Sequence, residues 1–178
     1  MARTLEVPEN PLARNLFGST RFAWLWTILR VYLGWTWFNS GWGKLGNPAW
    51  METGAALRGY WSNAVVVEPS ARIAFDWYRS FIQFLLDGGH YTWFAKLVVF
   101  GEILVGIALI LGAFTGIAAF FGGFMNFNFM MAGTASTNPL LYTIAILLML
   151  AWKVAGYYGL DRWLLPLLGT PWGPVRAR

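Results

Sequence analysis

The segment FAWLWTILRVYLGWTWFNSGWGKL, residues 22–45, decides how the rest of this chain can fold. It is long enough to cross a bilayer, which takes about 20 residues. Yet it carries Arg30 within the span and Lys44 at its far end. An arginine in hydrocarbon costs about 2.5–3.5 kcal/mol, so another part of the protein must receive it. At about 100° per residue, one face of the helix collects Arg30, Gly34, Trp37, Gly41 and Lys44.

The composition indicates an integral membrane protein. Hydrophobic residues make up 57% of the chain and charged residues 12%, whereas about 25% are charged in a typical globular protein. The apolar residues also gather into long runs. The net charge of +5 lies mostly near the termini, which favours membrane orientation and lipid contact over nucleic-acid binding.

Four membrane spans are predicted from these runs. The fold class is therefore all-α, a bundle of four transmembrane helices in which residues 1–178 form a single membrane domain. Glycine and alanine on one face of the third span favour close helix packing in lipid. The predicted spans are 22–43, 91–111, 114–132 and 139–158.

The distribution of arginine predicts the orientation. With four spans, both termini lie on one side of the membrane, and six arginines lie near them. The positive-inside rule places that side in the cytoplasm. We therefore expect a multi-pass protein of a bacterial or archaeal plasma membrane with both termini cytoplasmic. The six arginines are Arg3, Arg14, Arg21, Arg162, Arg176 and Arg178.

The connection 46–90 is then extracytoplasmic, and its second half is amphipathic. From Ser70 to Asp87, polar side chains occupy one arc of a helical wheel. The opposite arc holds Ile73, Trp77, Phe81 and Phe84. This pattern predicts a helix that lies flat on the membrane or caps the bundle.

Two opposite charges are predicted to meet inside the membrane. Arg30 lies about 12 Å from the cytoplasmic end of the first span and Glu102 about 15 Å from the same surface. A buried pair would resolve the cost of each charge alone. The pair either fixes helix register or lines a quinone or substrate pocket, which makes Arg30 and Glu102 the candidates for a catalytic role.

Other polar residues allow two interpretations each. Asn126 shares the small-residue face of the third span, so it either donates into a pocket or bridges helices. Lys44 ends the Arg30 face beside Trp42, so it either attracts an anionic substrate or anchors the helix at the interface. His90 is expected to be a solvated loop residue, because a single histidine does not build a metal site.

The sequence restricts the redox chemistry of this chain. It has no cysteine and one histidine, which excludes cysteine-held metal or iron–sulfur sites and a bis-histidine haem. Electrons would therefore be carried by a bound quinone or by a partner subunit. A quinone needs an apolar slot with a few hydrogen-bond donors, which Arg30, Trp37 and Asn126 could supply, with Glu102 in the same polar pocket.

Several motifs resemble the DoxX/DoxD family of integral membrane proteins. The first span, LRVYLGWTWFNSGWGKL, is similar to the family signature, and FGEILVGIALILGAFTGIAAFFG is similar to its second-to-third hairpin. MAGTASTNPLL and AWKVAGYYGLDRWLLP resemble the last helix and the G-x-x-G-L-D tail. Together with GNPAWMETGAALRGYW, they look closest to the DoxD type, the large subunit of thiosulfate:quinone oxidoreductase.

This resemblance implies a function and a rival to it. The chain would oxidise a small sulfur anion outside the membrane, attracted by Lys44 beside Trp42, and pass electrons to quinone. A DoxA-like small subunit would be a separate chain or absent. The rival is a non-catalytic accessory subunit of a larger respiratory or photosynthetic complex. A small-solute carrier is disfavoured, since broken helices in paired positions are missing.

Overall fold

The computed structural model describes residues 9–168, and every regular element within that range is helical. The prediction of an all-α fold is thus confirmed for these residues. Three of the arginines used to predict orientation, Arg3, Arg176 and Arg178, lie outside the described residues. The helices are α1 (Pro11–Gly18), the 3-10 turn η1 (Thr20–Phe22), α2 (Ala23–Leu45), α3 (Pro48–Met51), α4 (Ala55–Ala64), α5 (Asp76–Asp87), α6 (Tyr91–Leu111), α7 (Thr115–Met131), α8 (Asn138–Leu150), α9 (Trp152–Ala155) and α10 (Asp161–Leu167).

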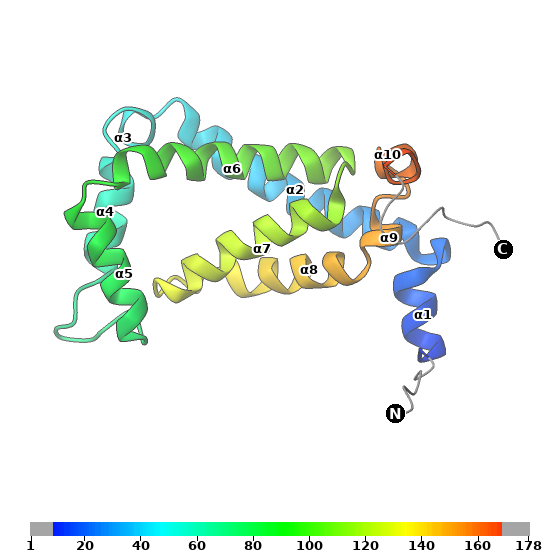
Figure 1. Ribbon diagram of the computed structural model, residues 1–178, viewed down its shortest axis with the longest axis horizontal. Coiled ribbons are helices and arrows are strands. Elements are labelled where there is room, and N and C mark those ends of the chain that lie inside the picture. The colour runs from blue at the N-terminus through cyan, green and yellow to red at the C-terminus, as the bar shows by residue number, and fades with distance from the viewer. Residues whose placement is uncertain (1–8, 169–178) are drawn as a thin grey trace, which may run out of the picture.

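Helices α2 and α6 form a tight antiparallel pair (Figure 1). Glycines bring the two backbones together, because a Cβ on Gly34 would lie 2.9 Å from the Gly106 carbonyl oxygen. A Cβ on Gly106 would in turn lie 2.5 Å from the backbone nitrogen of Phe38, and one on Gly41 would lie 3.0 Å from the Val99 carbonyl oxygen. Small residues at such contacts are how helices associate closely in lipid.

Helices α7 and α8 form a second antiparallel pair. Helix α7 starts beside the end of α6 and diverges from it toward α4 and α5, as Figure 1 shows. The turn between α6 and α7 uses Gly112 at φ 67° and Phe114 at φ 50°. Glycine adopts this left-handed region readily, whereas phenylalanine does not, so Phe114 has to be held there by its surroundings.

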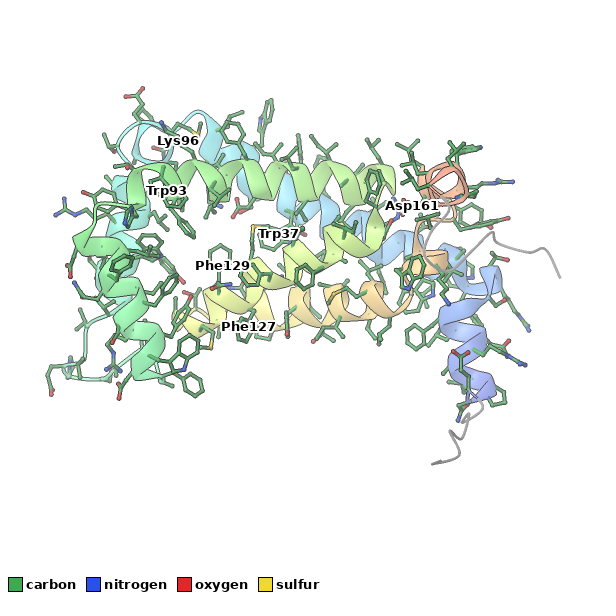
Figure 2. All side chains as sticks on the ribbon, viewed as in Figure 1. Trp37, Trp93, Lys96, Phe127, Phe129 and Asp161 are labelled. Atoms are coloured by element: carbon green, nitrogen blue, oxygen red, sulfur yellow. The ribbon has the colours of Figure 1, made fainter. Side chains whose placement is uncertain are left out.

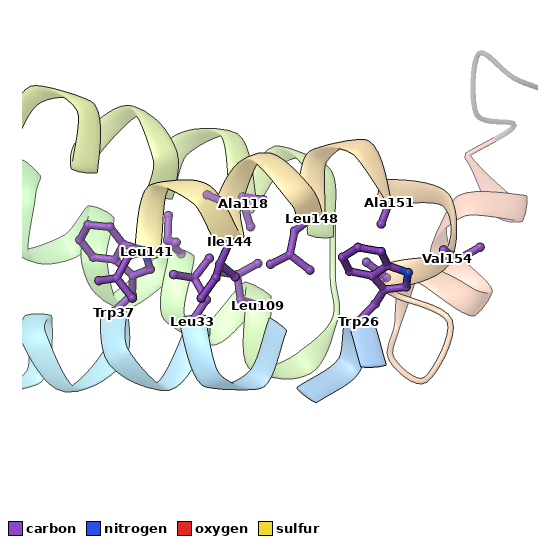
Figure 3. Close-up of a cluster of buried hydrophobic side chains, with 14 residues drawn as sticks. Trp26, Leu33, Trp37, Leu109, Ala118, Leu141, Ile144, Leu148, Ala151 and Val154 are labelled. Atoms are coloured by element: carbon purple, nitrogen blue, oxygen red, sulfur yellow. The ribbon is translucent and has the colours of Figure 1, made fainter. Parts of the chain in front are cut away.

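The core of the bundle lies between the two helix pairs (Figure 3). Trp26, Leu33 and Trp37 of α2 face Ile144 and Leu148 of α8, and all five side chains are buried. In lipid, such a core is stabilised by close packing, because the hydrocarbon outside is as apolar as the interior. The core therefore fixes how the pairs fit together.

Helices α4 and α5 lie across the open end of the bundle and cap it (Figure 1). Their core is separate and includes Leu57 of α4 and Tyr78 and Ile82 of α5. The predicted helix from Ser70 to Asp87 begins only at Asp76. The predicted apolar face is also shifted, because Tyr78, Ile82 and Leu85 are buried whereas Trp77 and Phe84 are exposed. The cap thus has a bundle-facing stripe and an exposed aromatic edge.

The four predicted spans match the long helices only in part. Of the helices in residues 9–168, α6 alone combines the length and the apolar composition needed to cross a bilayer, and α8 is apolar but shorter. The predicted span 139–158 ends early, since α8 stops at Leu150 and α9 at Ala155. Gly156 follows, and a Cβ there would clash with Asp161. A bundle of four complete spans is therefore not established by these helices.

The outward faces of the long helices are strongly apolar. Large hydrophobic side chains that are 40% exposed or more follow the outer sides of α6 and α7. A patch of this extent is rare on a soluble monomer and marks a surface that contacts lipid or protein. These residues are Trp93, Leu97, Phe100, Leu104, Ile107, Leu111, Ile117, Phe120, Phe121, Phe124 and Phe127, together with Phe114 in the turn between the two helices.

Candidate functional site

Arg30 is bound by backbone carbonyl groups at the end of α6. Its side chain is 1% exposed. One terminal nitrogen donates to the carbonyl oxygens of Leu109 at 2.6 Å and Ile110 at 3.2 Å, and the other to that of Tyr158 at 3.1 Å. A cation is stabilised there because unpaired carbonyls make a helix C-terminus negative. This contact is how the protein receives the charge in the first span.

Asp161 completes this end of the bundle, and the sequence reasoning gave it no role. Its carboxylate accepts hydrogen bonds from the backbone nitrogens of Phe114 at 2.6 Å and Thr115 at 2.9 Å. It therefore caps α7 as an N-cap side chain does, from a distant part of the chain. Its own nitrogen donates to the Gly112 carbonyl at 2.7 Å. The only signal in the sequence was the G-x-x-G-L-D tail, whose aspartate is this residue (Figure 2).

Glu102 is paired with Lys44. The Lys44 ammonium lies 2.8 Å and 2.5 Å from the two carboxylate oxygens of Glu102. It also donates to the Ser40 hydroxyl at 2.6 Å and lies 5.2 Å from the Trp50 ring centroid. Glu102 is 1% exposed, whereas the Lys44 side chain is 20% exposed. The result is a neutral, nearly buried ion pair between α2 and α6.

The predicted pair of Arg30 and Glu102 is therefore wrong. The prediction placed the ends of the first and second spans at one level. In the structure, the last turn of α6 lies opposite Arg30, so α2 begins about 10 Å beyond that end. The glycine contacts between the two helices set this offset, and it brings Glu102 level with Ser40 and Lys44.

Trp37 and Asn126 are buried between α2 and α7 without hydrogen-bond partners. Trp37 is 3% exposed and Asn126 is fully buried, and neither the indole nitrogen nor the amide atoms have a partner among residues 9–168. Trp37 packs against Gly122 and Phe129, which flank Asn126 by about one turn on either side. Figure 2 shows Trp37 and Phe129 on the side of α7 toward α6, and Phe127 on the opposite side.

Buried polar groups nearly always find partners, and leaving one unpaired costs about 1–3 kcal/mol. Within the described residues Asn126 does not bridge helices by a hydrogen bond, because neither atom of its amide has a partner there. An indole N–H and an amide thus keep unused hydrogen-bonding capacity in the interior. Among the described residues, the Nε atoms of Arg30 and Arg79 and the Thr115 hydroxyl are also buried without a partner, but Asn126 is the one side chain with neither its donor nor its acceptor used.

Trp42 does not lie with Lys44. Its side chain is 61% exposed and its ring stacks on Phe38, with 5.6 Å between centroids. The tryptophan over the Lys44 ammonium is Trp50, from α3. His90 is at the start of α6, where its Nδ1 accepts a hydrogen bond from the Trp93 indole at 3.2 Å.

The face predicted for the first span is thus confirmed as a buried stripe along α2, and three polar side chains are spaced along it. Arg30 lies at one end, Trp37 about 10 Å along the helix, and Lys44 about 10 Å further. The structure joins Lys44 to Glu102 and Trp37 to the turn of α7 that carries Asn126. It keeps Arg30 apart from both.

A helical bundle with an apolar exterior and its charges satisfied inside has the architecture of an integral membrane protein. The family model DoxX matches residues 25–136, from α2 to the turn after α7. The chain belongs to the DoxX family of membrane proteins. No curated protein and no solved structure matches it significantly.

Proposed function

We propose that this DoxX protein is a DoxD-type, quinone-reactive membrane subunit. It belongs to a system that oxidises a small sulfur anion such as thiosulfate and passes the electrons to membrane quinone. The finer assignment is supported by the resemblance of residues 46–61 and of the tail after α8 to the DoxD type.

The observation that carries the proposal is the unpartnered pair of Trp37 and Asn126. A quinone combines a flat apolar ring with two carbonyl acceptors, which suits an apolar site with few polar groups. The Trp37 indole and the Asn126 amide nitrogen would donate to a quinone carbonyl. The Asn126 oxygen would accept from a quinol hydroxyl, so both redox states find a partner.

The proposed oxidation of thiosulfate by quinone needs no cysteine-bound cofactor in this chain. Two thiosulfate anions join through a new S–S bond and release two electrons. These electrons and two protons convert quinone to quinol. Trp37 and Asn126 would hold the ring, and Glu102 would be the buried carboxylate nearest the outer end of the site.

Lys44 and Arg30 already have protein partners, so we assign them fewer contacts with substrate and quinone than the sequence suggested. Both terminal nitrogens of Arg30 already donate to carbonyl groups, so we assign it to holding the end of α6. Lys44 is neutralised by Glu102. An anion that binds Lys44 must displace Glu102, which then takes up a proton. Trp42 could contact that anion only from the exposed rim.

Thiosulfate-dependent quinone reduction by the purified protein tests this function, with and without any chains that co-purify. Trp37→Phe keeps the ring and removes one donor. We expect it to lower quinone occupancy by about 3- to 10-fold, the worth of one hydrogen bond. Trp35→Phe is the matched control, since Trp35 is 57% exposed on the same helix. Equal losses in both variants, or stoichiometric metal or haem in the pure protein, would overturn the proposal.

A second candidate is an accessory subunit without catalysis. It is favoured by the fact that both cations of the first span already have protein partners, the terminal nitrogens of Arg30 in carbonyl groups and Lys44 in Glu102. Protein that contains neither quinone nor metal and co-purifies with a respiratory or photosynthetic complex would support this candidate instead.

A further inference from the structure

A cavity of about 170 Å³ lies under the cap, between α4 and α5 on one side and α6 and α7 on the other. We call it the cap cavity. The helices that line it meet where α7 diverges from α6, at the end of the bundle that α4 and α5 cross (Figure 1). Its walls include Leu57, Trp61, Ile82, Phe94 and Val98.

The size and lining of the cap cavity suit a ring. An apolar cavity of about 150 Å³ in another protein stays dry and binds benzene. The cap cavity is slightly larger and is lined mainly by aromatic and aliphatic side chains. It therefore has room for a small ring system but not for a complete isoprenoid lipid.

The cap cavity opens toward the apolar exterior. Phe81 of α5 and Phe124 of α7 both line it, yet they are 45% and 56% exposed. Phe124 belongs to the exposed apolar row of α7, with Phe120 stacked one turn before it. A molecule with a long apolar tail can therefore place its ring inside and leave the tail in the membrane.

A hydroxyl and an amide supply polarity inside the cap cavity. The Tyr78 hydroxyl lies 3.1 Å from both the carbonyl oxygen and the side-chain oxygen of Asn128. It has one proton for these two acceptors, so it can be redirected to a ligand carbonyl. Burial raises the pKa of Tyr78 to about 12, and so the hydroxyl keeps its proton at any physiological pH.

We propose that the cap cavity is the entry site of the membrane quinone, whose ring passes between Phe81 and Phe124 and accepts a hydrogen bond from Tyr78. This inference rests on the proposed quinone-reactive function. Phe129 is a wall of the cap cavity and also packs on Trp37, with 6.4 Å between ring centroids. The entry site thus adjoins the interior donors Trp37 and Asn126.

Photolabelling of the full-length protein in lipid nanodiscs tests the position. The probe is an azidoquinone with a short isoprenoid tail, and labelled peptides are located by mass spectrometry. We expect saturable labelling of the α5 and α7 peptides, competed by unlabelled quinone. Ala132→Leu, which fills part of the cap cavity, should reduce that labelling by about tenfold.

Two pairs of variants separate the entry site from general effects on folding. Tyr78→Phe should raise the quinone concentration for half-maximal labelling by about 3- to 10-fold, because one hydrogen bond is lost. Tyr32→Phe, on the exposed side of α2, should not. Phe124→Ala should change labelling, whereas Phe120→Ala, one turn away and 54% exposed, should not.

The outcomes distinguish this inference from the function on which it rests. Labelling confined to other helices, or unaffected by Ala132→Leu and Tyr78→Phe in folded protein, overturns the entry site even if thiosulfate-dependent turnover is observed. Saturable labelling of α5 and α7 in a protein that never reduces quinone keeps the site and removes the function. Absence of saturable labelling in folded wild-type protein also overturns the inference.

Discussion

At the scale of single residues, the charges inside the bundle differ in how they are satisfied. Glu102 is 1% exposed and has Lys44 as its only ionic partner in the described part of the chain. The Lys44 side chain is 20% exposed and has a long stem that can reach the surface. The loss of stability on removing one partner should therefore depend on which charge remains, and it should be larger when Glu102 remains than when Lys44 remains.

We predict that Lys44→Met destabilises the protein by about 3–5 kcal/mol, because it leaves Glu102 buried and unpaired. Glu102→Leu should cost less, since Lys44 can turn outward. The double variant should recover most of the loss. Unfolding of detergent-solubilised protein measures all three, and Lys96→Met, at an exposed position of α6, is the control. Additive effects of the two single variants would show that the pair contributes nothing.

The same pair shows why the site could be predicted only in part. Residue type and periodicity identified Arg30, Trp37, Glu102 and Asn126 as polar positions inside the bundle and Lys44 as the outer end of the same face. They did not identify which charge meets which, because that depends on an offset of about 10 Å between two helices. Asp161, which caps α7 although it lies 46 residues or more further along the chain, is marked in the sequence only by the G-x-x-G-L-D motif, which does not say what its carboxylate contacts.

At the scale of the elements, the long helices were predictable because apolar runs are the strongest signal in a sequence. The span 91–111 matches α6 at both ends, and 114–132 matches α7 to within one residue. The last span was drawn too long because residues 156–158 extend the apolar run but belong to the loop whose Gly159 packs on Gly112. Tertiary contact, rather than local preference, ends that helix.

The close packing of α2 on α6 gives a test at this scale. Gly34→Ala would place a Cβ 2.9 Å from the Gly106 carbonyl oxygen and 2.8 Å from the Leu109 Cβ. Backbone cannot yield as a flexible side chain does, so we expect a loss of about 1–3 kcal/mol in stability. Gly43→Ala, on the same helix with open space around it, should be neutral or stabilising by up to about 1 kcal/mol. Thermal unfolding of both variants in one detergent makes the comparison, and equal shifts would contradict it.

At the scale of the whole molecule, the proposed orientation places the cap outside the cell and both termini inside. The chain has no cysteine, so single introduced cysteines report their position without background. We predict that cysteines at Ser62 and Ser70, both exposed in the cap, react with an impermeant maleimide in whole cells. One at Ala177, beyond the described residues, should not react. The reverse pattern would move the cap cavity to the cytoplasmic side.

The turn at Gly112 has a mechanical consequence for the bundle. Arg30 and Asp161 connect it to α2 and to the start of α10, whereas the other ends of α6 and α7 stand apart (Figure 1). The ends of α6 and α7 at this turn are thus fixed. Any change in the angle between the two helices displaces their other ends most. A rotation of α7 by about 5° moves its far end, about 25 Å away, by about 2 Å. The hydrogen bonds from Tyr60 of α4 and Tyr78 of α5 to the last turns of α7 therefore act where such a displacement would be largest.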